Sequence, residues 1–332
     1  MSTAATTGVF VVGAAASLLT SWVVVSRIER VGARLGATEA LLGVVAALAG
    51  DAPEITSAVT ALLDHQGAVA AGVSIGSNVF NLAALLGLSA VISGRIVLRR
   101  RAILLEGTVA IWIALACFCT VLGVFSPAVG LGVVAVALVP YLVVMATSRN
   151  HRWRRRGASR WERWVSAAVV EEEVELAATI HPSRGQRRDA LTGAGALVVV
   201  VLASVAMEHA ASRLGSRLAV PDIIVGGVIL AAVTSLPNAV AAVYWARRTR
   251  GVAMLSTGLN SNAFNVAVGL LLPAVILGLG HRSGPEVLTA AWYLGLSVLA
   301  LVLAYRQAAL NRAAGCLVIA LYLAFVAVVS GV

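Results

Sequence analysis

The chain has 332 residues, of which 60% are hydrophobic and 12% are charged, with a formal net charge of +10. Soluble domains are about 45–50% apolar and about 25% charged, so this composition excludes a soluble cytosolic enzyme, a nucleic-acid-binding module and a disordered chain. All 25 basic residues are arginine, and they occur in short clusters between long apolar runs. The 3 cysteines lie inside apolar runs, without the spacing of a disulfide framework or a metal site.

Ten apolar segments are long enough to cross a membrane, because a spanning helix needs about 20 mostly apolar residues. The predicted spans are 7–25, 35–63, 67–93, 102–123, 126–147, 190–211, 221–245, 251–279, 286–304 and 313–331. We therefore expect an all-α integral membrane protein with ten transmembrane helices. Residues 1–10 contain no basic residue, so we expect the first segment to be a retained span rather than a cleaved signal peptide.

The arginines predict the orientation of these spans, because cytoplasmic loops carry an excess of basic residues. With the N-terminus outside, 22 of the 25 arginines fall in cytoplasmic connections, and only Arg213, Arg217 and Arg282 remain outside. The opposite orientation inverts this ratio. We therefore expect a multi-pass protein of the plasma (inner) membrane with both termini on the outer face.

The longest connection, residues 148–188, is expected to be cytoplasmic. It opens with a basic run that contains tryptophan and turns acidic at residues 171–175. Arginine beside tryptophan is typical of an interfacial helix on anionic lipid. We interpret the acidic run as a solvated charged helix, with a regulatory Ca²⁺ site as the alternative.

Two motifs recur along the chain, and both recur at the same offset. The first pair is Gly50-Asp-Ala-Pro-Glu54 and Thr234-Ser-Leu-Pro-Asn238, and the second pair is Gly76-Ser-Asn-Val-Phe-Asn81 and Asn260-Ser-Asn-Ala-Phe-Asn265. An odd number of spans in each half makes the second half inverted relative to the first. We expect two inverted five-helix repeats, 1–147 and 189–332, with broken helices at the midplane. This architecture is typical of secondary transporters, whose substrate site lies near the bilayer midplane.

The first motif of each half contains a proline, Pro53 or Pro237, and proline predicts a helix break. Carbonyl groups freed at membrane depth are tolerated where they line a cavity or coordinate an ion. Of the 15 acidic residues, only Asp51 and Glu54 fall in the middle of a predicted span. Ionisable residues at that depth are functional candidates by default. Their spacing places both carboxyl groups on one helix face.

The motifs add neutral oxygen ligands to these two carboxyl groups. The candidate metal-ligating residues are Asp51, Glu54, Ser77, Asn81, Thr234, Ser235, Asn238, Ser261 and Asn265. Carboxylate, amide and hydroxyl oxygens are hard ligands that suit Ca²⁺ and also Na⁺, but not Zn²⁺ or copper. The alternative for the serines and asparagines is hydrogen bonding between helices. His65 and His209 lie near the outer ends of spans, and we expect them to be bystanders.

At these residues the chain resembles the cation/Ca²⁺ exchanger superfamily, the membrane region of sodium/calcium exchangers. That family has two α-repeats, each with a G-(T/S)-S-x-P-E motif and a G-S-N-x-F-N motif, and the resemblance covers essentially the whole chain. It implies that the positions of Glu54 and Asn238 coordinate Ca²⁺ or the counter-cation, together with the second-motif positions. It also implies that the first and sixth spans slide to expose the site to one side at a time.

Two residues depart from the family pattern. Asn238 stands where the family has its second glutamate, and Asp51 stands where it has a serine. Both deep carboxyl groups therefore come from one half of the chain and lie one helical turn apart, where like charges disfavour one another. We expect such a site to bind protons as well as metal, so that transport depends on pH.

The combined expectation is an antiporter, not an enzyme, that exchanges Ca²⁺ or a similar divalent cation for Na⁺ or H⁺ by alternating access. It implies no cofactor, and its partners are membrane lipid and the transported cations, with no nucleic acid. Two alternatives remain open. One is an exchanger for another divalent cation, and the other is a non-transporting membrane ion sensor that signals through the 148–188 loop.

Overall fold

The computed structural model describes residues 2–35, 39–147, 164–165, 167–168, 186–247, 251–280 and 284–331. The acidic run and all but a few residues of the predicted interfacial segment in the 148–188 loop lie outside the described residues. The regular elements of the first half are α1 (Thr3–Arg34), α2 (Glu39–Gly50), α3 (Ala52–Leu63), α4 (Gly67–Asn81), the π-helical segment η1 (Leu82–Leu88), α5 (Ser89–Ser93), β1 (Arg95–Val97), α6 (Arg100–Leu122) and α7 (Pro127–Thr147).

The second half repeats this order of elements. Its elements are α9 (Arg187–Leu218), α10 (Asp222–Ile224), the π-helical segment η3 (Val225–Leu230), α11 (Ala231–Thr234), α12 (Leu236–Arg247), α13 (Gly251–Phe264), the π-helical segment η4 (Asn265–Leu271), α14 (Leu272–Leu277), α15 (Gly284–Gln307), β2 (Ala309–Asn311) and α16 (Arg312–Gly331). The first residues of α9, α12, α13 and α15 follow those of α1, α3, α4 and α6 at one common offset. This offset of the helices is also the offset of the sequence motifs.

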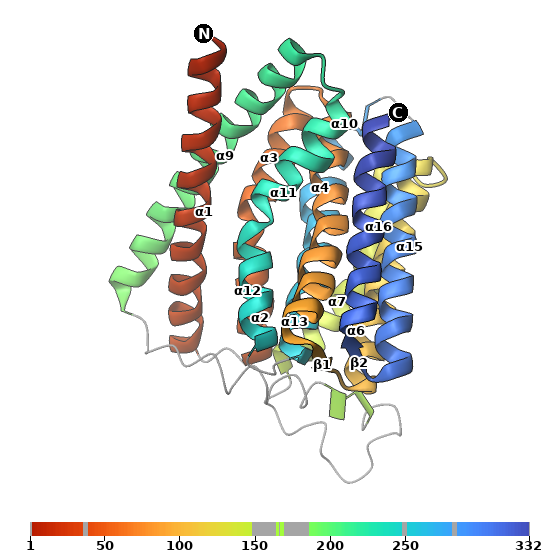
Figure 1. Ribbon diagram of the computed structural model, residues 1–332. Coiled ribbons are helices and arrows are strands. Elements are labelled where there is room, and N and C mark those ends of the chain that lie inside the picture. The colour runs from red at the N-terminus through yellow and green to blue at the C-terminus, as the bar shows by residue number, and fades with distance from the viewer. Residues whose placement is uncertain are drawn as a thin grey trace.

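The two halves start from opposite ends of the helix stack. The first residues of α1 lie beside the last turn of α9, since Arg217 Nη1 is 3.5 Å from Thr3 Oγ1. At the other end of the same pair, Arg27 near the end of α1 contacts Asp189 in the first turn of α9. The N-terminus and the C-terminus lie at one end of the stack, the upper end in Figure 1.

Eight of the described helices are long and apolar enough to cross a membrane. They correspond to eight of the predicted spans. The other two predicted spans, 35–63 and 221–245, are each divided into shorter helices at Asp51 and Ser235. Division follows from the prolines, since Pro53 and Pro237 have no N–H for the helix ladder.

Helices α1 and α9 each extend beyond the predicted spans 7–25 and 190–211, to 32 residues. Hydropathy locates the apolar part of a helix but not its polar ends. At the start of α9 a capping box explains the extension, because Gln186 and Asp189 satisfy each other's backbone N–H groups.

The second motifs, unlike the first, do not break their helices, so the broken helices expected at the motifs occur only at the first motif of each half. Gly76 lies inside α4 and Asn260 inside α13, and each helix widens into a π-helical segment only at the end of the motif, η1 or η4. Neither motif contains proline, so the helix ladder continues through it. Short π-helical segments within α-helices occur frequently at functional sites.

A short antiparallel ribbon departs from the all-α expectation. Strand β1 pairs with β2, with Arg95 opposite Asn311 and Val97 opposite Ala309. The sequence predicts only connections at these positions, because the strands are short and pair across the two halves. The ribbon joins the end of α5 to the start of α16, at the lower end of the stack in Figure 1.

Glycine brings α4 and η3 into backbone contact. A Cβ atom on Gly76 would lie 2.5 Å from the Cα of Gly227, and a Cβ on Gly72 would lie 2.7 Å from the backbone nitrogen of Gly227. Small residues allow helix backbones to approach closely in membranes, where packing rather than hydrophobic burial drives association. This contact fixes α4 against the broken helix of the other half.

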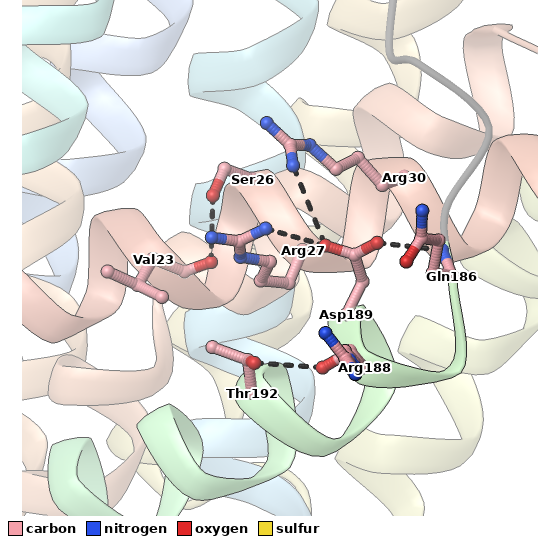
Figure 2. Close-up of polar contacts among 8 residues, drawn as sticks. All are labelled: Val23, Ser26, Arg27, Arg30, Gln186, Arg188, Asp189 and Thr192. Atoms are coloured by element: carbon pink, nitrogen blue, oxygen red, sulfur yellow. Dashed lines mark hydrogen bonds and ion pairs between the residues drawn. The ribbon is translucent and has the colours of Figure 1, made fainter.

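An ion-pair cluster joins α1 to α9 at the end of the stack opposite the termini (Figure 2). Asp189 Oδ1 lies 2.6 Å from Arg27 Nη1 and 3.5 Å from Arg30 Nη1. The other oxygen, Oδ2, accepts a hydrogen bond of 2.7 Å from the backbone N–H of Gln186. One carboxylate therefore caps α9 and holds it to α1.

The glycine contact generates a matched pair of variants. Gly76→Ala places a methyl group against the backbone of Gly227, and overpacking of this kind costs about 1–3 kcal/mol or more. Gly227→Ala adds the same group on the other side of the contact, where its nearest neighbour would be 3.6 Å away. We expect Gly76→Ala to lower the thermal stability of the detergent-solubilised protein by several degrees and Gly227→Ala to leave it near wild type. Equal stability of the two variants would contradict this packing.

Candidate ion-binding site

Two helix breaks occupy equivalent places in the two halves. Asp51 links α2 to α3 with φ −82° and ψ 1°, and Ser235 links α11 to α12 with φ −84° and ψ 0°. These angles lie between the helical and extended regions, where the chain turns without continuing the helix. Pro53 and Pro237 have no N–H group. The backbone carbonyl four residues before each proline therefore has no helical hydrogen-bond donor.

Asp51 lies at the centre of a buried hydrogen-bond cluster and has 0% of its surface exposed. Its Oδ1 accepts a hydrogen bond of 2.6 Å from the hydroxyl of Ser261 and one of 2.9 Å from the amide of Asn238. Asn238 Nδ2 also lies within 3.1 Å of Ser261 Oγ. One carboxylate oxygen of the first half is thus bound by two motif residues of the second half.

Glu54 lies one turn after Asp51, in the first turn of α3, and is 1% exposed. Its Oε1 accepts a hydrogen bond of 3.0 Å from the hydroxyl of Ser235, the residue at the other helix break. The start of a helix favours a negative charge, because the N–H groups of its first turn point outwards. Each carboxylate of the first half is therefore bound by the break region of the second half.

Asparagine side chains connect the second motifs across the two halves. Asn78 Nδ2 donates to the carbonyl of Asn262 at 3.0 Å, and Asn262 Nδ2 donates to the carbonyl of Asn78 at 3.3 Å. Around this reciprocal pair, Asn81 Nδ2 donates to Asn262 Oδ1 and Asn265 Nδ2 donates to Asn78 Oδ1, each at 3.1 Å. Asn81 also donates to Ser261 Oγ at 3.1 Å, which joins this network to Asp51.

Several oxygens around these contacts are buried and accept no hydrogen bond within the described part of the chain. Such atoms are rare in folded proteins, and each calls for an explanation such as a bound water or ion. They comprise one oxygen of each carboxylate, two amide oxygens and three hydroxyls, namely Asp51 Oδ2, Glu54 Oε2, Asn81 Oδ1, Asn265 Oδ1, Ser57 Oγ, Ser74 Oγ and Ser77 Oγ.

The structure links most of the residues that the sequence singles out, but not all. Direct hydrogen bonds join Asp51, Asn81, Asn238 and Ser261, a separate bond joins Glu54 to Ser235, and Asn265 joins through Asn78. The hydroxyl of Thr234 donates to the carbonyl of Leu230, four residues earlier, and makes no hydrogen bond to the other candidate residues. Ser77 is buried, but no hydrogen bond ties it to the cluster.

Sequence reasoning missed Asn78 and Asn262. Both belong to the second motifs and occupy equivalent positions in them, so the repeat itself was the available signal. Helical spacing from Ser77 and Ser261 points to Asn81 and Asn265 instead. The amide donors of Asn78 and Asn262 contact backbone carbonyls of the opposite half, and only the folded chain reveals that contact.

The atoms gathered here are chemically suited to a hard cation. Two carboxylates, amide oxygens and hydroxyls meet in this buried region. Ca²⁺ takes 6–8 oxygen ligands in flexible geometry. Two carboxylates also balance the charge of one divalent ion, which lowers the cost of burying both.

Comparison with known proteins gives the family. The sodium/calcium exchanger protein family matches residues 5–149 and 190–331. The chain is 30% identical over 152 residues to the sodium/potassium/calcium exchanger Nckx30C of Drosophila melanogaster, a match that covers 44% of this chain and 17% of that protein. It is 27% identical over 146 residues to the human sodium/potassium/calcium exchanger 2, covering 42% of this chain and 22% of the relative. The matched region is therefore about a fifth of these relatives.

Solved structures show the same fold. The sodium-calcium exchanger NCX_Mj superposes with a TM-score of 0.64 at 21% identity, covering 98% of this chain and 99% of that one. The H⁺/Ca²⁺ exchanger CAX superposes with a TM-score of 0.73 at 14% identity, covering 98% of this chain and 85% of that one. The chain is thus a multi-pass membrane protein and belongs to the sodium/calcium exchanger protein family.

Proposed function

We propose that this protein is an antiporter that exchanges Ca²⁺, or a similar divalent cation, for Na⁺ or H⁺ across the membrane. The observation that carries the proposal is the pair of buried carboxylates Asp51 and Glu54, each with one oxygen that accepts no hydrogen bond from the described residues. The names of the similar proteins, sodium/potassium/calcium, sodium-calcium and H⁺/Ca²⁺ exchangers, support the same ions.

The carboxylate cage consists of Asp51, Glu54 and the side chains that hydrogen-bond to them. It explains exchange because the two kinds of cation compete for the same oxygens. A divalent ion and its counter-cations bind the two carboxylates alternately, so neither crosses while the other occupies the site. An empty site holds two buried negative charges, whose desolvation opposes the change of access. Na⁺ or H⁺ neutralises Asp51 and Glu54 on the return step. The metal set under this proposal is Glu54, Asp51, Ser77, Asn81, Thr234, Ser235, Asn238, Ser261 and Asn265.

The architecture under this proposal is ten transmembrane helices in two inverted repeats, 1–147 and 189–332. Two lines of support are the common offset of the helices and the opposite directions of α1 and α9. The divided spans 39–63 and 222–247 complete the ten. The arginine distribution supports a topology with both termini outside and the 148–188 loop in the cytoplasm.

The first prediction concerns Glu54. Glu54→Gln keeps the size of the side chain but removes a charge from the cage, and we expect it to abolish ⁴⁵Ca²⁺ uptake into proteoliposomes. The measurement uses Na⁺ and pH gradients applied separately, which also identifies the counter-ion. Asp222→Asn, at an exposed carboxylate, is the matched control and is expected to transport like wild type. Wild-type uptake by Glu54→Gln would refute the site, and binding of Ca²⁺ without uptake by the unaltered protein would indicate a sensor.

The contact between Asp51 and Asn238 generates the second prediction. Asp51→Ser with Asn238→Glu moves one carboxylate to the other half and exchanges donor and acceptor in a 2.9 Å contact. We expect the double variant to retain transport and to shift coupling from H⁺ towards Na⁺, whereas each single change alters the number of acids and impairs transport.

In the wild type, protons compete for two adjacent carboxylates, so lowering the pH from about 8 to 6 should weaken Ca²⁺ uptake. Uptake that is indifferent to pH and driven only by Na⁺ would contradict proton coupling.

The third prediction tests the orientation. Single cysteines at Thr3 and at Val97, in a background without the three native cysteines, lie at exposed positions at opposite ends of the stack. We expect a membrane-impermeant thiol reagent to label Thr3→Cys in intact cells and Val97→Cys only after permeabilisation. The reverse pattern would place the termini in the cytoplasm.

A further inference from the structure

A second group of metal-ligating side chains lies away from the candidate ion-binding site. Asp64, Glu208 and His209 place one ligand atom each within 4.8 Å of one another. His209 Nε2 is 2.8 Å from Asp64 Oδ2 and 3.7 Å from Glu208 Oε2. Asp64 follows the last residue of α3, while Glu208 and His209 belong to α9, so the group bridges two helices.

The group lies at the end of the stack that carries both termini. Arg217, two turns further along α9, reaches Thr3 at the start of α1. A pocket of about 420 Å³ opens here, lined by Asp64, Gln66, His209, Ser212, Arg213, Ser216 and Arg217. A ligand can therefore enter the group without passing through the candidate ion-binding site.

An ion pair between His209 and Asp64 does not by itself account for this arrangement. Their side chains are 42% and 40% exposed, and exposed ion pairs contribute little to stability. Glu208 beneath them is 0% exposed. Its Oε1 accepts a hydrogen bond of 2.9 Å from Ser212, but among the described residues its Oε2 accepts none and points towards His209. A buried carboxylate oxygen without a hydrogen bond is costly unless a cation binds it.

The repeat offers no structural reason for the group. The positions equivalent to Glu208, His209 and Asp64 in the opposite half are Val24, Val25 and Arg248, none of which is a usual metal ligand. None of the three side chains therefore recurs at the equivalent position of the other half, so the repeat that builds the fold does not require them.

We propose that Asp64, Glu208 and His209 form a regulatory site for a transition-metal ion of the Zn²⁺ class, which ties α9 to α3 and slows exchange when it binds. One imidazole and two carboxylates suit Zn²⁺, Co²⁺ or Ni²⁺, whereas Ca²⁺ and Na⁺ prefer oxygen ligands alone. Arg213 and Arg217 line the same pocket, so their charge opposes cations in general. Affinity comes from coordination bonds, which favours transition metals over Ca²⁺.

The link to exchange follows from the helix that the metal would hold. Glu54 lies in the first turn of α3, and Asp64 follows the last residue of that helix. At a rise of 1.5 Å per residue, the two residues are about 15 Å apart. Helix α9 packs along α1, and Ser21 of α1 donates to the carbonyl of Gly50 at the first helix break. A metal ion that joins α3 to α9 therefore restrains the helix that carries Glu54 and the partner of α1, the helix that contacts the first break.

The binding test uses the full-length protein in lipid nanodiscs, with Co²⁺ as a spectroscopic probe and Zn²⁺ as its competitor, in excess Ca²⁺. We expect the wild type to show a visible Co²⁺ absorption band that Zn²⁺ removes. We expect His209→Asn and Asp64→Asn to weaken binding by about 100-fold or more, because loss of an outer partner alone costs about 10- to 100-fold. His65→Asn is the matched control, since His65 is exposed and adjacent to Asp64 but outside the group.

The flux test rests on the proposed function and is read separately. Zn²⁺ on the outer side should inhibit Ca²⁺ uptake by the wild type and by His65→Asn. In His209→Asn, the Zn²⁺ concentration that halves uptake should be at least about tenfold higher. The uptake of each protein is compared with its own rate without Zn²⁺. Absence of Co²⁺ binding, or an equal loss of binding in His65→Asn and His209→Asn, overturns the site. Equal Zn²⁺ inhibition of all variants overturns the regulatory role and indicates competition at the carboxylate cage. If no variant transports Ca²⁺, the proposed function fails while the Co²⁺ result still decides the metal site.

Discussion

A polar group buried among these helices needs a partner in the protein or a bound water or ion, because the surrounding hydrocarbon offers no hydrogen bonds. Asn78 and Asn262 meet this requirement reciprocally, since each side-chain amide donates to the other's backbone carbonyl. Asn81 and Asn265 attach their amide groups to the same pair and turn their oxygens away from it. The side-chain amide donors of these asparagines thus join the two halves. The side-chain oxygens of Asn81 and Asn265 accept no hydrogen bond from the described residues, and such oxygens can bind a cation.

The backbone of the two halves is alike, but their charge is not. The breaks at Asp51 and Ser235 have nearly the same backbone angles, yet only the first carries an acid, and only the first is followed by a glutamate. The second half compensates with donors, because Ser235, Asn238 and Ser261 each donate to a carboxylate of the first half. A carboxylate that already accepts one or two hydrogen bonds is less costly to bury and keeps a defined direction. The asymmetry therefore leaves the geometry of the cage intact while concentrating its charge on one helix.

The sequence predicts much of this arrangement because two signals are strong in it. Apolar runs locate the spans, and one repeated offset with two prolines locates the breaks at Asp51 and Ser235. It does not predict that the second motifs continue as helices into η1 and η4, because a π-helical segment leaves no signature in hydropathy. Nor does it predict that Thr234 bonds within its own helix, or that His209 contacts Asp64. These outcomes depend on how helices distant in sequence approach each other, as the glycine contact between α4 and η3 illustrates.

The pairing of α1 with α9 shows how the two ends of the molecule differ. At the end with the arginine clusters, Asp189 holds Arg27 and Arg30 in an ion pair confined to these two helices. At the end with the termini, α9 contacts α1 through Arg217 and Thr3, and it also contacts the turn between α3 and α4, through Asp64 with His209 and Gln66 with Ser212. In between, Ser17 and Ser204 join α1 to α9 by a single buried hydroxyl contact of 2.8 Å. The α1–α9 pair is thus held together at both ends, and it contacts the first half's broken helix at two places, Gly50 and the turn after α3. If these two helices move during the proposed exchange, a ligand bound at the junction of α3 and α9 would oppose that movement.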